Sequence, residues 1–544
     1  MAIDALGWMV LAPAIGALLL TTFPRGAGPA QRNFALLVSA APLAIAIQLW
    51  ARFDPAFGGF QFVEQAEWIP RFGIAWRLGV DGISLLLVLL TVLLTPLVLF
   101  AAPQSIHQRL KGYLVAMLLL ETAMLGTLVA LDLVLFYVFW ELMLVPMFLI
   151  IGVWGGERRV YAALKFVLFT MVGSLPMLAA ILYLGLHHAD VAGAPSFALT
   201  DLYAARVVGT AQHWLFLAFS LAFAIKVPMW PLHTWLPDAH VEAPTGGSVI
   251  LAGVLLKMGT YGFVRFVLPL FPDAVAAWSP LIGVLAVIGI VYGALVAMVQ
   301  PDMKKLVAYS SVSHLGFVML GIASLNSVAL SGAVYQMVGH GLSTGALFLL
   351  VGVVYERRHT RLISEYGGLW TQMPRYAVCF LVVMLASVGL PGLSGFVGEF
   401  LILIGAFEAS PWLAAGAVSG VVLGAAYMLR MYQRVMFGEI DEQKNGRLED
   451  LHAGELAVLA PLLVLIVVMG VYPKPFLGMI ETSVAETLQL ATGGRESVPV
   501  SDAFAAACAG ETETAAEASA CGASTSAALA GERESADLQH RGAH

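Results

Sequence analysis

Long apolar runs constrain this chain more than any other feature of its sequence. Stretches of about 20 mainly apolar residues recur from Ile3 to about residue 475, and each could cross a ~30 Å hydrocarbon core as an α-helix. The composition agrees, because only 12% of the residues are charged, whereas soluble domains usually carry roughly 25%. We therefore predict an all-α integral membrane protein.

The apolar runs define about 14 predicted transmembrane helices. We expect them at 3–22, 34–50, 81–101, 112–131, 133–153, 161–186, 212–227, 245–268, 277–299, 304–323, 327–354, 376–409, 412–433 and 456–472. Only Leu131 and Asp132 separate the fourth from the fifth, which predicts a tight turn. Asp4 stands where a signal peptide would carry basic residues, so we expect the first run to be retained as a span.

The connections between these spans differ in positive charge. Fifteen Lys and Arg residues fall in the odd-numbered connections, whereas five fall in the even-numbered ones and the stub after the last span. Because Lys and Arg accumulate on the cytoplasmic side of a membrane, the bias places the N-terminus on the outer side. An even number of spans then returns the C-terminus to the same side.

Two spans contain proline and glycine breaks. Pro228 and Pro231 interrupt the seventh span, and Pro391 with neighbouring glycines interrupts the twelfth. The two spans are five apart, so corresponding helices run in opposite directions, which is typical of inverted repeats. We therefore predict two inverted five-helix repeats, each with a broken helix. The expected segments are 1–111 (helices 1–3), 112–270 (first repeat, helices 4–8), 271–435 (second repeat, helices 9–13), 436–492 (final helix and stub) and 493–544 (tail).

The tail at 493–544 has a different composition. It is rich in Ala, Glu, Ser and Gly and has few large apolar side chains. Such a segment cannot bury enough surface to offset the entropy of ordering it, so we predict disorder.

Six of the ionisable residues inside or at the edge of predicted spans stand out. A charge at membrane depth costs several kcal/mol by most measures, so each is a functional hypothesis. Lys257 is mid-span, where its side chain cannot easily reach the interface. The six are Glu141, Lys226, Lys257, His314, His340 and Glu399.

Structural alternatives exist for most of these residues. Glu141 and Lys226 could form a static salt bridge between two helices, and each histidine could simply be hydrogen-bonded by neighbouring serines. We interpret the remaining charges in or beside the spans as structural. They are Arg265 and Arg430 near span ends, Lys304 and Lys305 as a positive-inside cap, Asp132 in a turn, and Asp238 and Glu242 in the connection between spans seven and eight.

The sequence has no pattern for a bound cofactor. The three cysteines form no CxxC pair, no HxxxH occurs among the buried charges, and no glycine-rich phosphate-binding fingerprint follows a predicted strand. We therefore expect neither a metal nor a nucleotide in this chain.

Several longer motifs carry a family resemblance. They are LGVDGIS at 78–84, FWELMLVPMFLI at 139–150, KVPMWPLHTWLPDAHVEAPTGGSVILAGVLLK at 226–257, SSVSHLGF at 310–317 and GLPGLSGFVGEF at 389–400. With these motifs the chain resembles the antiporter-like subunits of respiratory complex I, the NADH:quinone oxidoreductase, over residues 1 to about 475. Glu399 stands where the L and N subunits are expected to have lysine, and no apolar helix is expected after residue 472, so the chain is most similar to the M-type branch.

The resemblance implies a proton-translocating role for the six residues. Glu141 and Lys226 would modulate the uptake half of the path, and Lys257 would be its central relay. The two histidines would connect Lys257 to Glu399, which would be the exit-side group.

The resemblance also implies partners. Electron transfer from NADH to quinone through FMN and iron–sulfur clusters would occur in other subunits, so no cofactor is expected here. The expected partners are the L-like and N-like subunits and the lipid bilayer of a bacterial inner membrane, with no nucleic acid. The alternatives are a multisubunit Na⁺/H⁺ antiporter subunit, a membrane-arm subunit of a hydrogenase or formate-oxidising complex, and a passive membrane spacer.

Overall fold

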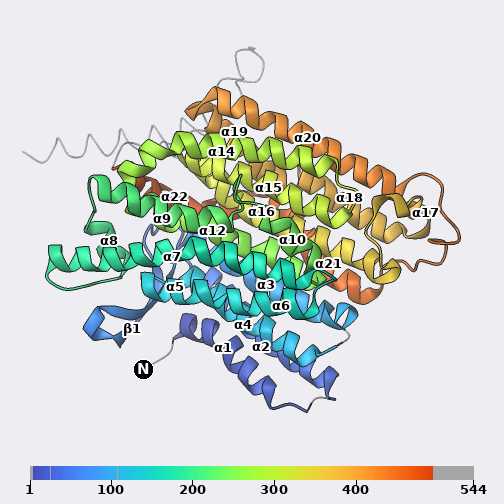
Figure 1. Ribbon diagram of the computed structural model, residues 1–544, viewed down its shortest axis with the longest axis horizontal. Helices are drawn as coiled ribbons and strands as arrows, with labels where there is room; N and C mark the ends of the chain where they lie inside the picture. Colours follow the sequence, from blue (N-terminus) through green and yellow to red (C-terminus); the bar gives the residue numbers. More distant parts are fainter. Residues whose placement is uncertain (1–3, 25, 107, 494–544) are drawn as a thin grey trace, which may run out of the picture. The chain divides into compact units, whose positions relative to one another are not determined.

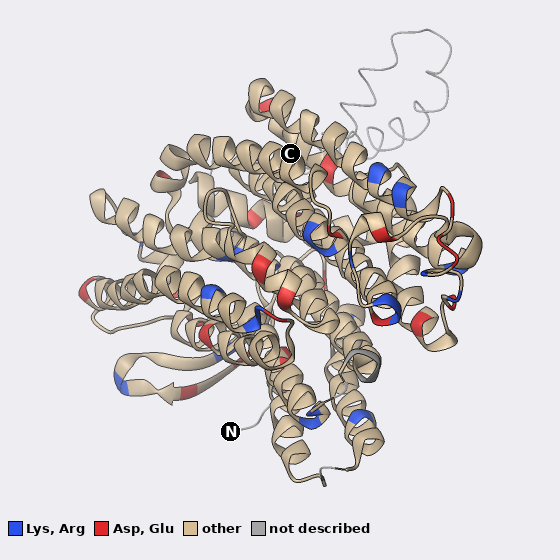
Figure 2. Ribbon diagram, turned by 45° about the vertical axis from the view of Figure 1, so that its right-hand side comes forward, with Lys and Arg blue, Asp and Glu red and all other residues tan. Residues whose placement is uncertain are grey.

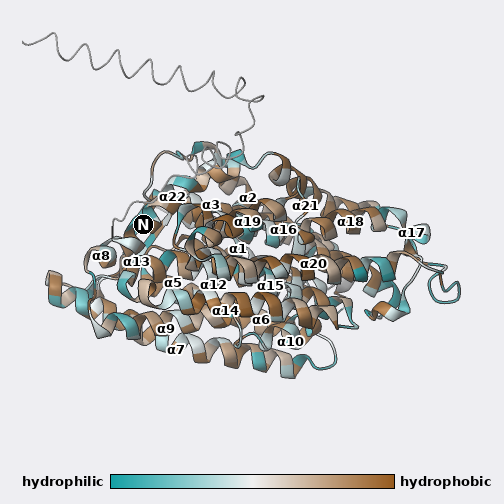
Figure 3. Ribbon diagram, turned by 90° about the horizontal axis from the view of Figure 1, so that it is seen from above, coloured by the Kyte–Doolittle hydropathy of each residue, from teal (hydrophilic) through white to brown (hydrophobic). Residues whose placement is uncertain are grey.

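The computed structural model describes residues 4–24, 26–106 and 108–493. The tail predicted to be disordered lies outside the described residues from residue 494 on. Within these ranges long helices lie side by side (Figure 1). Figure 3 shows hydrophilic colours near the loops at α8 and α17 and hydrophobic colours along the helices between them. The described part therefore has the helical membrane architecture that the apolar runs predict.

The helices and strands have the following bounds. The first part comprises α1 (Ala5–Thr21), α2 (Gly28–Arg52), β1 (Gln61–Ile69), η1 (Pro70–Phe72), β2 (Ile74–Val80), α3 (Gly82–Ser105), α4 (Leu110–Val129), α5 (Leu133–Leu142), α6 (Leu144–Trp154), α7 (Arg159–Ala192) and α8 (Leu199–Ala204). The middle part comprises α9 (Thr210–Lys226), α10 (Trp235–Glu242), α11 (Thr245–Ile250), η2 (Leu251–Leu255), α12 (Leu256–Gly262), η3 (Phe263–Val267), α13 (Leu268–Leu270), α14 (Pro272–Met298) and α15 (Met303–Ala323). The last part comprises α16 (Ser327–Arg358), η4 (Ile363–Glu365), α17 (Leu369–Gln372), α18 (Pro374–Val388), α19 (Ser394–Ala409), α20 (Pro411–Met436), α21 (Ala453–Val471) and α22 (Lys474–Thr492).

Eleven helical segments in the described residues are long and apolar enough to cross a membrane. Ala5–Thr21 and Pro374–Val388 are shorter apolar helices. The multi-pass helical fold is confirmed, whereas the count of 14 spans and the inverted repeats stay predictions. Asp132 ends the tight turn before α5, where its side chain accepts hydrogen bonds from the N–H groups of Val134 and Leu135.

Both predicted helix breaks are present. α9 ends at Lys226, and α10 begins only at Trp235 after an irregular segment. α18 ends before Gly389, whose φ of +82° favours glycine, and α19 begins at Ser394. Asp238 and Glu242 lie in the connection between spans seven and eight, as expected, and the connection there forms the short helix α10.

A small β-hairpin was not predicted among the helices. β1 and β2 pair antiparallel between α2 and α3, close to the start of the chain in Figure 1. Glu64 of β1 accepts hydrogen bonds from the backbone N–H groups of Leu6 at 2.6 Å and Gly7 at 2.9 Å. These groups lack partners within the first turn of α1, so Glu64 caps that helix from a distant segment.

Replacing Glu64 by Ala should weaken the attachment of α1. The loss of two charge-assisted hydrogen bonds to a helix N-terminus should cost about 1 kcal/mol. We expect a lower temperature midpoint for thermal unfolding of the detergent-solubilised protein. Glu64→Gln keeps one acceptor oxygen and should lie between Ala and the unchanged protein, whereas equal midpoints for all three would contradict the capping role.

The segment after α21 also differs from the prediction. Residues 474–492, expected as a stub, form the helix α22, which is amphipathic and therefore does not contradict the expectation that no apolar helix follows residue 472. Its buried face follows helical spacing through Phe476, Ile480, Val484 and Leu488, and Ser483 accepts a hydrogen bond from the Gly82 N–H at 3.0 Å. Polar residues between these positions lower the mean hydropathy, so a search for continuous apolar runs misses such a helix.

Two spans lie at the centre of the fold. The segment Thr245–Leu270 and the helix α16 are buried throughout their most apolar windows. Glycines bring the two together, because a Cβ on Gly341 of α16 would lie 2.9 Å from the Gly253 carbonyl of η2. This approach places the backbone beside His340 against the turn that precedes Lys257.

Candidate functional site

Lys257 and His340 form a direct contact in the buried centre. Lys257 is 1% exposed on α12, and its Nζ lies 2.7 Å from Nδ1 of His340 on α16. Nζ also donates to the carbonyl of Ala252 at 2.5 Å. Ala252 belongs to the π-helical turn η2, whose altered hydrogen-bond register is a frequent feature of functional sites. One proton between Nζ and Nδ1 can therefore reside on either nitrogen.

A second contact joins His314 and Glu399. Nδ1 of His314 on α15 lies 2.7 Å from Oε1 of Glu399 on α19, and both residues are buried. The same oxygen accepts a hydrogen bond from Nε2 of Gln336 at 3.0 Å. Glu399 lies in the second turn of α19, which begins after the break at Gly389. The break lies close to the carboxyl group, because a Cβ added to Gly389 would be 3.2 Å from Oε2 of Glu399.

The two contacts meet at the histidines. The imidazole rings of His314 and His340 have centroids 5.6 Å apart, and neither Nε2 has a hydrogen-bond partner among the described residues. The structure thus brings four of the six predicted residues into one buried file, ordered Lys257, His340, His314 and Glu399. Within this file, the two hydrogen-bonded pairs are separated by the gap between the two imidazole rings.

Glu141 and Lys226 do not form the closed ion pair of the structural alternative. In the described residues Nζ of Lys226 has no hydrogen-bond partner, and Oε1 of Glu141 is also unpartnered. The ammonium group instead lies over the rings of Trp140 at 5.2 Å and Phe166 at 5.4 Å. Glu141 remains near enough to act on Lys226 electrostatically.

Lys226 adjoins the helix that bears Lys257. Lys226 is the last residue of α9, before the break, and Gly259 of α12 lies so close that its Cβ would be 2.8 Å from the Val227 nitrogen. No direct contact joins the two lysines within the described ranges. A small movement at the break would change the distance between them without disturbing a hydrogen bond of Lys226.

Sequence reasoning missed three buried polar residues. Gln336 lies one turn before His340 on α16, at a spacing that could have revealed it. Glu121 on α4 is fully buried and is hydrogen-bonded to Ser39 of α2 at 3.1 Å. His240 on α10 stacks on Phe348 with centroids 4.7 Å apart, and it was read only as part of a connection.

Three of the charges interpreted as structural differ in their burial and contacts. Lys304 is buried at the start of α15 and donates to the Ala243 carbonyl at 2.5 Å, whereas Lys305 is exposed, so the positive-inside cap stays a prediction for both. Arg265 is also buried and is paired with Asp81 at 2.5 Å. Because this pair joins η3 to the N-cap of α3, the structural interpretation of Arg265 fits its contacts.

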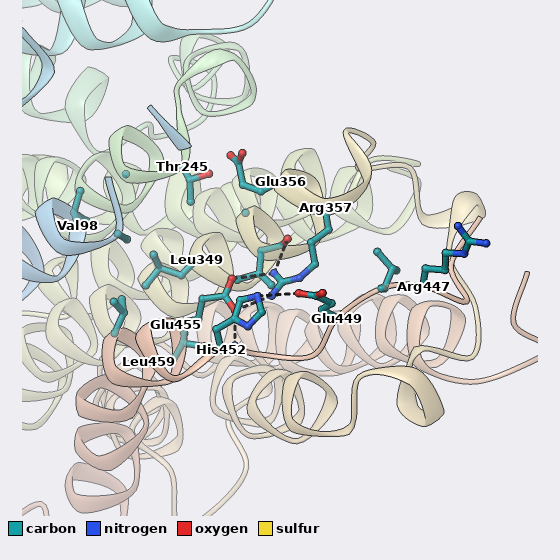
Figure 4. Close-up of a pocket in the computed structure, with 16 residues that line it drawn as sticks. Val98, Thr245, Leu349, Glu356, Arg357, Arg447, Glu449, His452, Glu455 and Leu459 are labelled. Atoms are coloured by element: carbon teal, nitrogen blue, oxygen red, sulfur yellow. Dashed lines mark hydrogen bonds and ion pairs between the residues drawn. The ribbon is translucent and has the colours of Figure 1, made fainter. Parts of the chain in front are cut away.

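Two larger cavities lie away from the buried file. One of about 420 Å³ has an apolar wall that includes Leu349 and Leu459, and a charged wall in which Arg357 is paired with Glu455 (Figure 4). The other, of about 590 Å³, is lined in part by Lys304. Figure 2 shows many of the chain's charges on loops and helix ends, with only scattered charged bands on the helices.

The described residues contain no group of three or more His, Cys, Asp or Glu side chains that could hold a metal ion. The buried file instead combines amine, imidazole and carboxyl groups at hydrogen-bond distances. Each can gain or lose a proton, and such groups inside a membrane commonly form proton relays. Proton transfer is the chemistry that this arrangement supports.

Comparison with known proteins gives consistent matches. The sequence model of the family described as "NADH:quinone oxidoreductase/Mrp antiporter, TM" matches residues 130–424. The NADH-quinone oxidoreductase subunit M of Rhodobacter capsulatus is 49% identical over 488 residues, which cover 88% of this chain and 95% of that protein.

Solved structures share the fold. A chain of respiratory complex I from Thermus thermophilus with bound NADH superposes with a TM-score of 0.81 at 39% identity, covering 90% of this chain and all of that one. A chain of the Mrp complex from Dietzia sp. gives a TM-score of 0.77 at 21% identity, covering 91% of this chain and 100% of that one. The second match concerns the fold alone.

Proposed function

Since the chain belongs to the family of transmembrane subunits shared by NADH:quinone oxidoreductases and Mrp antiporters, we propose that it translocates protons as an M-type subunit of NADH:quinone oxidoreductase. The observation that carries the proposal is the buried file from Lys257 through His340 and His314 to Glu399. Burying these groups is costly, and the file is continuous except for one gap between two imidazole rings.

The protein's part in the mechanism is proton transfer along this file. An ammonium of Lys257 can pass a proton to Nδ1 of His340, because the two nitrogens are already at hydrogen-bond distance. One bridging water between the two Nε2 atoms would carry the next step. An imidazolium of His314 then gives its Nδ1 proton to Glu399.

Glu141 and Lys226 form the controlling pair in this proposal. In this proposal the carboxylate of Glu141 acts on the ammonium of Lys226, and the open geometry lets this influence change when the helices move. The close approach of Gly259 to Val227 holds the helix that bears Lys257 against the end of α9 that bears Lys226. Chemistry in other subunits would supply the movement.

Partners and orientation complete the proposal. NADH, FMN, iron–sulfur clusters and quinone are bound by other subunits, and the L-like and N-like subunits are neighbours in the membrane arm. The chain lies in a bacterial inner membrane with both termini on the outer side, as the distribution of Lys and Arg supports.

The runner-up functions are a Na⁺/H⁺ antiporter subunit and a membrane-arm subunit of an energy-converting hydrogenase. The 49% identity to a subunit M, against 21% to a chain of an Mrp complex, favours the oxidoreductase. The decisive experiment measures NADH-driven proton uptake by proteoliposomes that contain the purified complex, with and without sodium. Sodium-independent uptake that is lost with this subunit is expected, whereas strict sodium dependence would favour the antiporter.

Glu141→Ala separates a controlling pair from a structural one. Because no closed ion pair is broken, we expect nearly normal amounts of assembled complex and about a tenfold loss of coupled proton uptake. Quantitative native gels of the membranes measure the amount of assembled complex, and proteoliposomes measure the proton uptake per complex. Arg265→Ala is the matched control, because it breaks the buried pair with Asp81 and should lower abundance first. A similar loss of complex in Glu141→Ala would favour the static bridge.

A further inference from the structure

The amide of Gln336 contacts the last carboxyl of the buried file. Gln336 is 2% exposed, and its Nε2 donates to Oε1 of Glu399 at 3.0 Å, the oxygen that also contacts His314. Its own Oε1 has no hydrogen-bond partner among the described residues. A buried amide with one end unused is uncommon, because an unsatisfied carbonyl oxygen costs roughly 1–3 kcal/mol.

The surrounding backbone places this amide tightly. Gly398, directly before Glu399 on α19, lies so near α16 that its Cβ would be 2.6 Å from Oε1 and 2.9 Å from Cα of Gln336. Gln336 and His340 are one turn apart on α16, so they face α15 and α19 together. The glutamine therefore stands beside the point where the file ends.

We propose that Gln336 is a positioning residue that serves both protonation states of Glu399 by turning its amide over. With the carboxylate charged, the NH₂ group donates to it, as in the structure. When His314 gives its Nδ1 proton to a carboxylate oxygen, an O–H bond forms and the imidazole becomes neutral. A half-turn of the amide about its last torsion then presents the unused carbonyl oxygen, which accepts from the new O–H.

The two orientations have a consequence for direction. An amide that has turned to accept from the carboxylic acid holds that proton away from His314, which opposes its return to the histidine. This inference rests on the proposed proton relay and adds a residue to it. The other polar groups facing Glu399 are His314 on α15 and Tyr427 on α20, with His340 next along the file.

Gln336→Leu removes both the donor and the acceptor at similar volume. We expect assembled complex in normal amounts, proton uptake reduced by about tenfold and a shifted infrared carboxylic-acid band from Glu399, because the O–H of the acid loses its acceptor. Ser331→Ala is the matched control, since Ser331 is equally buried on α16 and its hydroxyl has no partner within the described residues. It should leave the uptake and the band unchanged.

The test has separate outcomes for the inference and for the proposed function. Normal uptake and an unshifted band in Gln336→Leu, while Glu399→Gln is inactive, would overturn the role of Gln336 alone. Normal uptake in Glu399→Gln would overturn the relay itself. If Gln336→Leu fails to assemble, infrared difference spectra of the unchanged complex with ¹³C-labelled glutamine decide. If the amide of Gln336 turns over, the unchanged complex should show an amide carbonyl band that shifts when Glu399 is protonated, and neither Glu399→Gln nor Gln336→Asn should show it. If the unchanged complex lacks this band, the proposed turn of the amide is refuted.

Discussion

Lys257→Ala should reduce coupled proton uptake by about 100-fold while the complex still assembles. Lys257 begins the buried file, and its Nζ makes the contact with Nδ1 of His340 at 2.7 Å. Alanine leaves His340 without a proton donor, and a removed proton-transfer group typically costs 10²–10⁴-fold in rate. The measurement is NADH-driven proton uptake by proteoliposomes, normalised to the amount of intact complex.

Lys257→Arg is the informative companion to this change. A guanidinium keeps the positive charge but stays protonated, since its pKa lies above ~12, and it cannot release a proton to His340. We therefore expect the Arg variant to assemble, as the Ala variant does, but not to restore uptake. Robust uptake by the Arg variant would show that Lys257 contributes a fixed charge and not a proton.

Glu399→Gln should have an effect of similar size at the other end of the file. The amide has nearly the shape of the carboxyl group but cannot take the proton from His314. It also turns the contact with Gln336 into one between two amides, which can still form a hydrogen bond. We expect about a 100-fold loss of proton uptake with the complex intact.

Glu399→Lys should retain appreciable uptake. An amine at this position can also gain and lose a proton, and the unused oxygen of Gln336 can turn to accept from it. Gln keeps the size of the side chain without a titratable group, whereas Lys keeps a titratable group without the size. Comparing the two variants therefore shows which of these properties proton uptake requires. Full activity of Glu399→Gln would remove Glu399 from the path and leave it as a buried structural carboxyl group.

Three of the buried charges were predictable because their cost is visible in the sequence, although Glu121, which also interrupts an apolar run, was missed. Glu141, Lys257 and Glu399 each interrupt an apolar run, and this holds whatever the helices pack against. Gln336 and His240 gave no such signal. A neutral polar residue in a span is common, and His240 belongs to a segment that was read as a connection.

The order of the relay depends on tertiary packing. His314 and Glu399 are 85 residues apart, and Lys257 and His340 are 83 apart, yet both pairs are at 2.7 Å. Glycines that no local rule singles out bring these helices into contact, as Gly341 does against Gly253. The open geometry of Glu141 and Lys226 likewise follows from how Trp140 and Phe166 occupy the space around the ammonium group.

By itself, the sequence determined that the chain is a helical membrane protein, that two of its helices are broken, and that ionisable residues interrupt its apolar runs. Hydropathy and backbone chemistry are local properties, so they can be read along the chain. Only the tertiary structure decided which of those groups lie at hydrogen-bond distance, that α22 and the β1–β2 hairpin pack onto the helices, and that Lys304 is buried. These depend on contacts between distant segments, and close helix packing in a membrane is set by the fit of small residues, which hydropathy does not record.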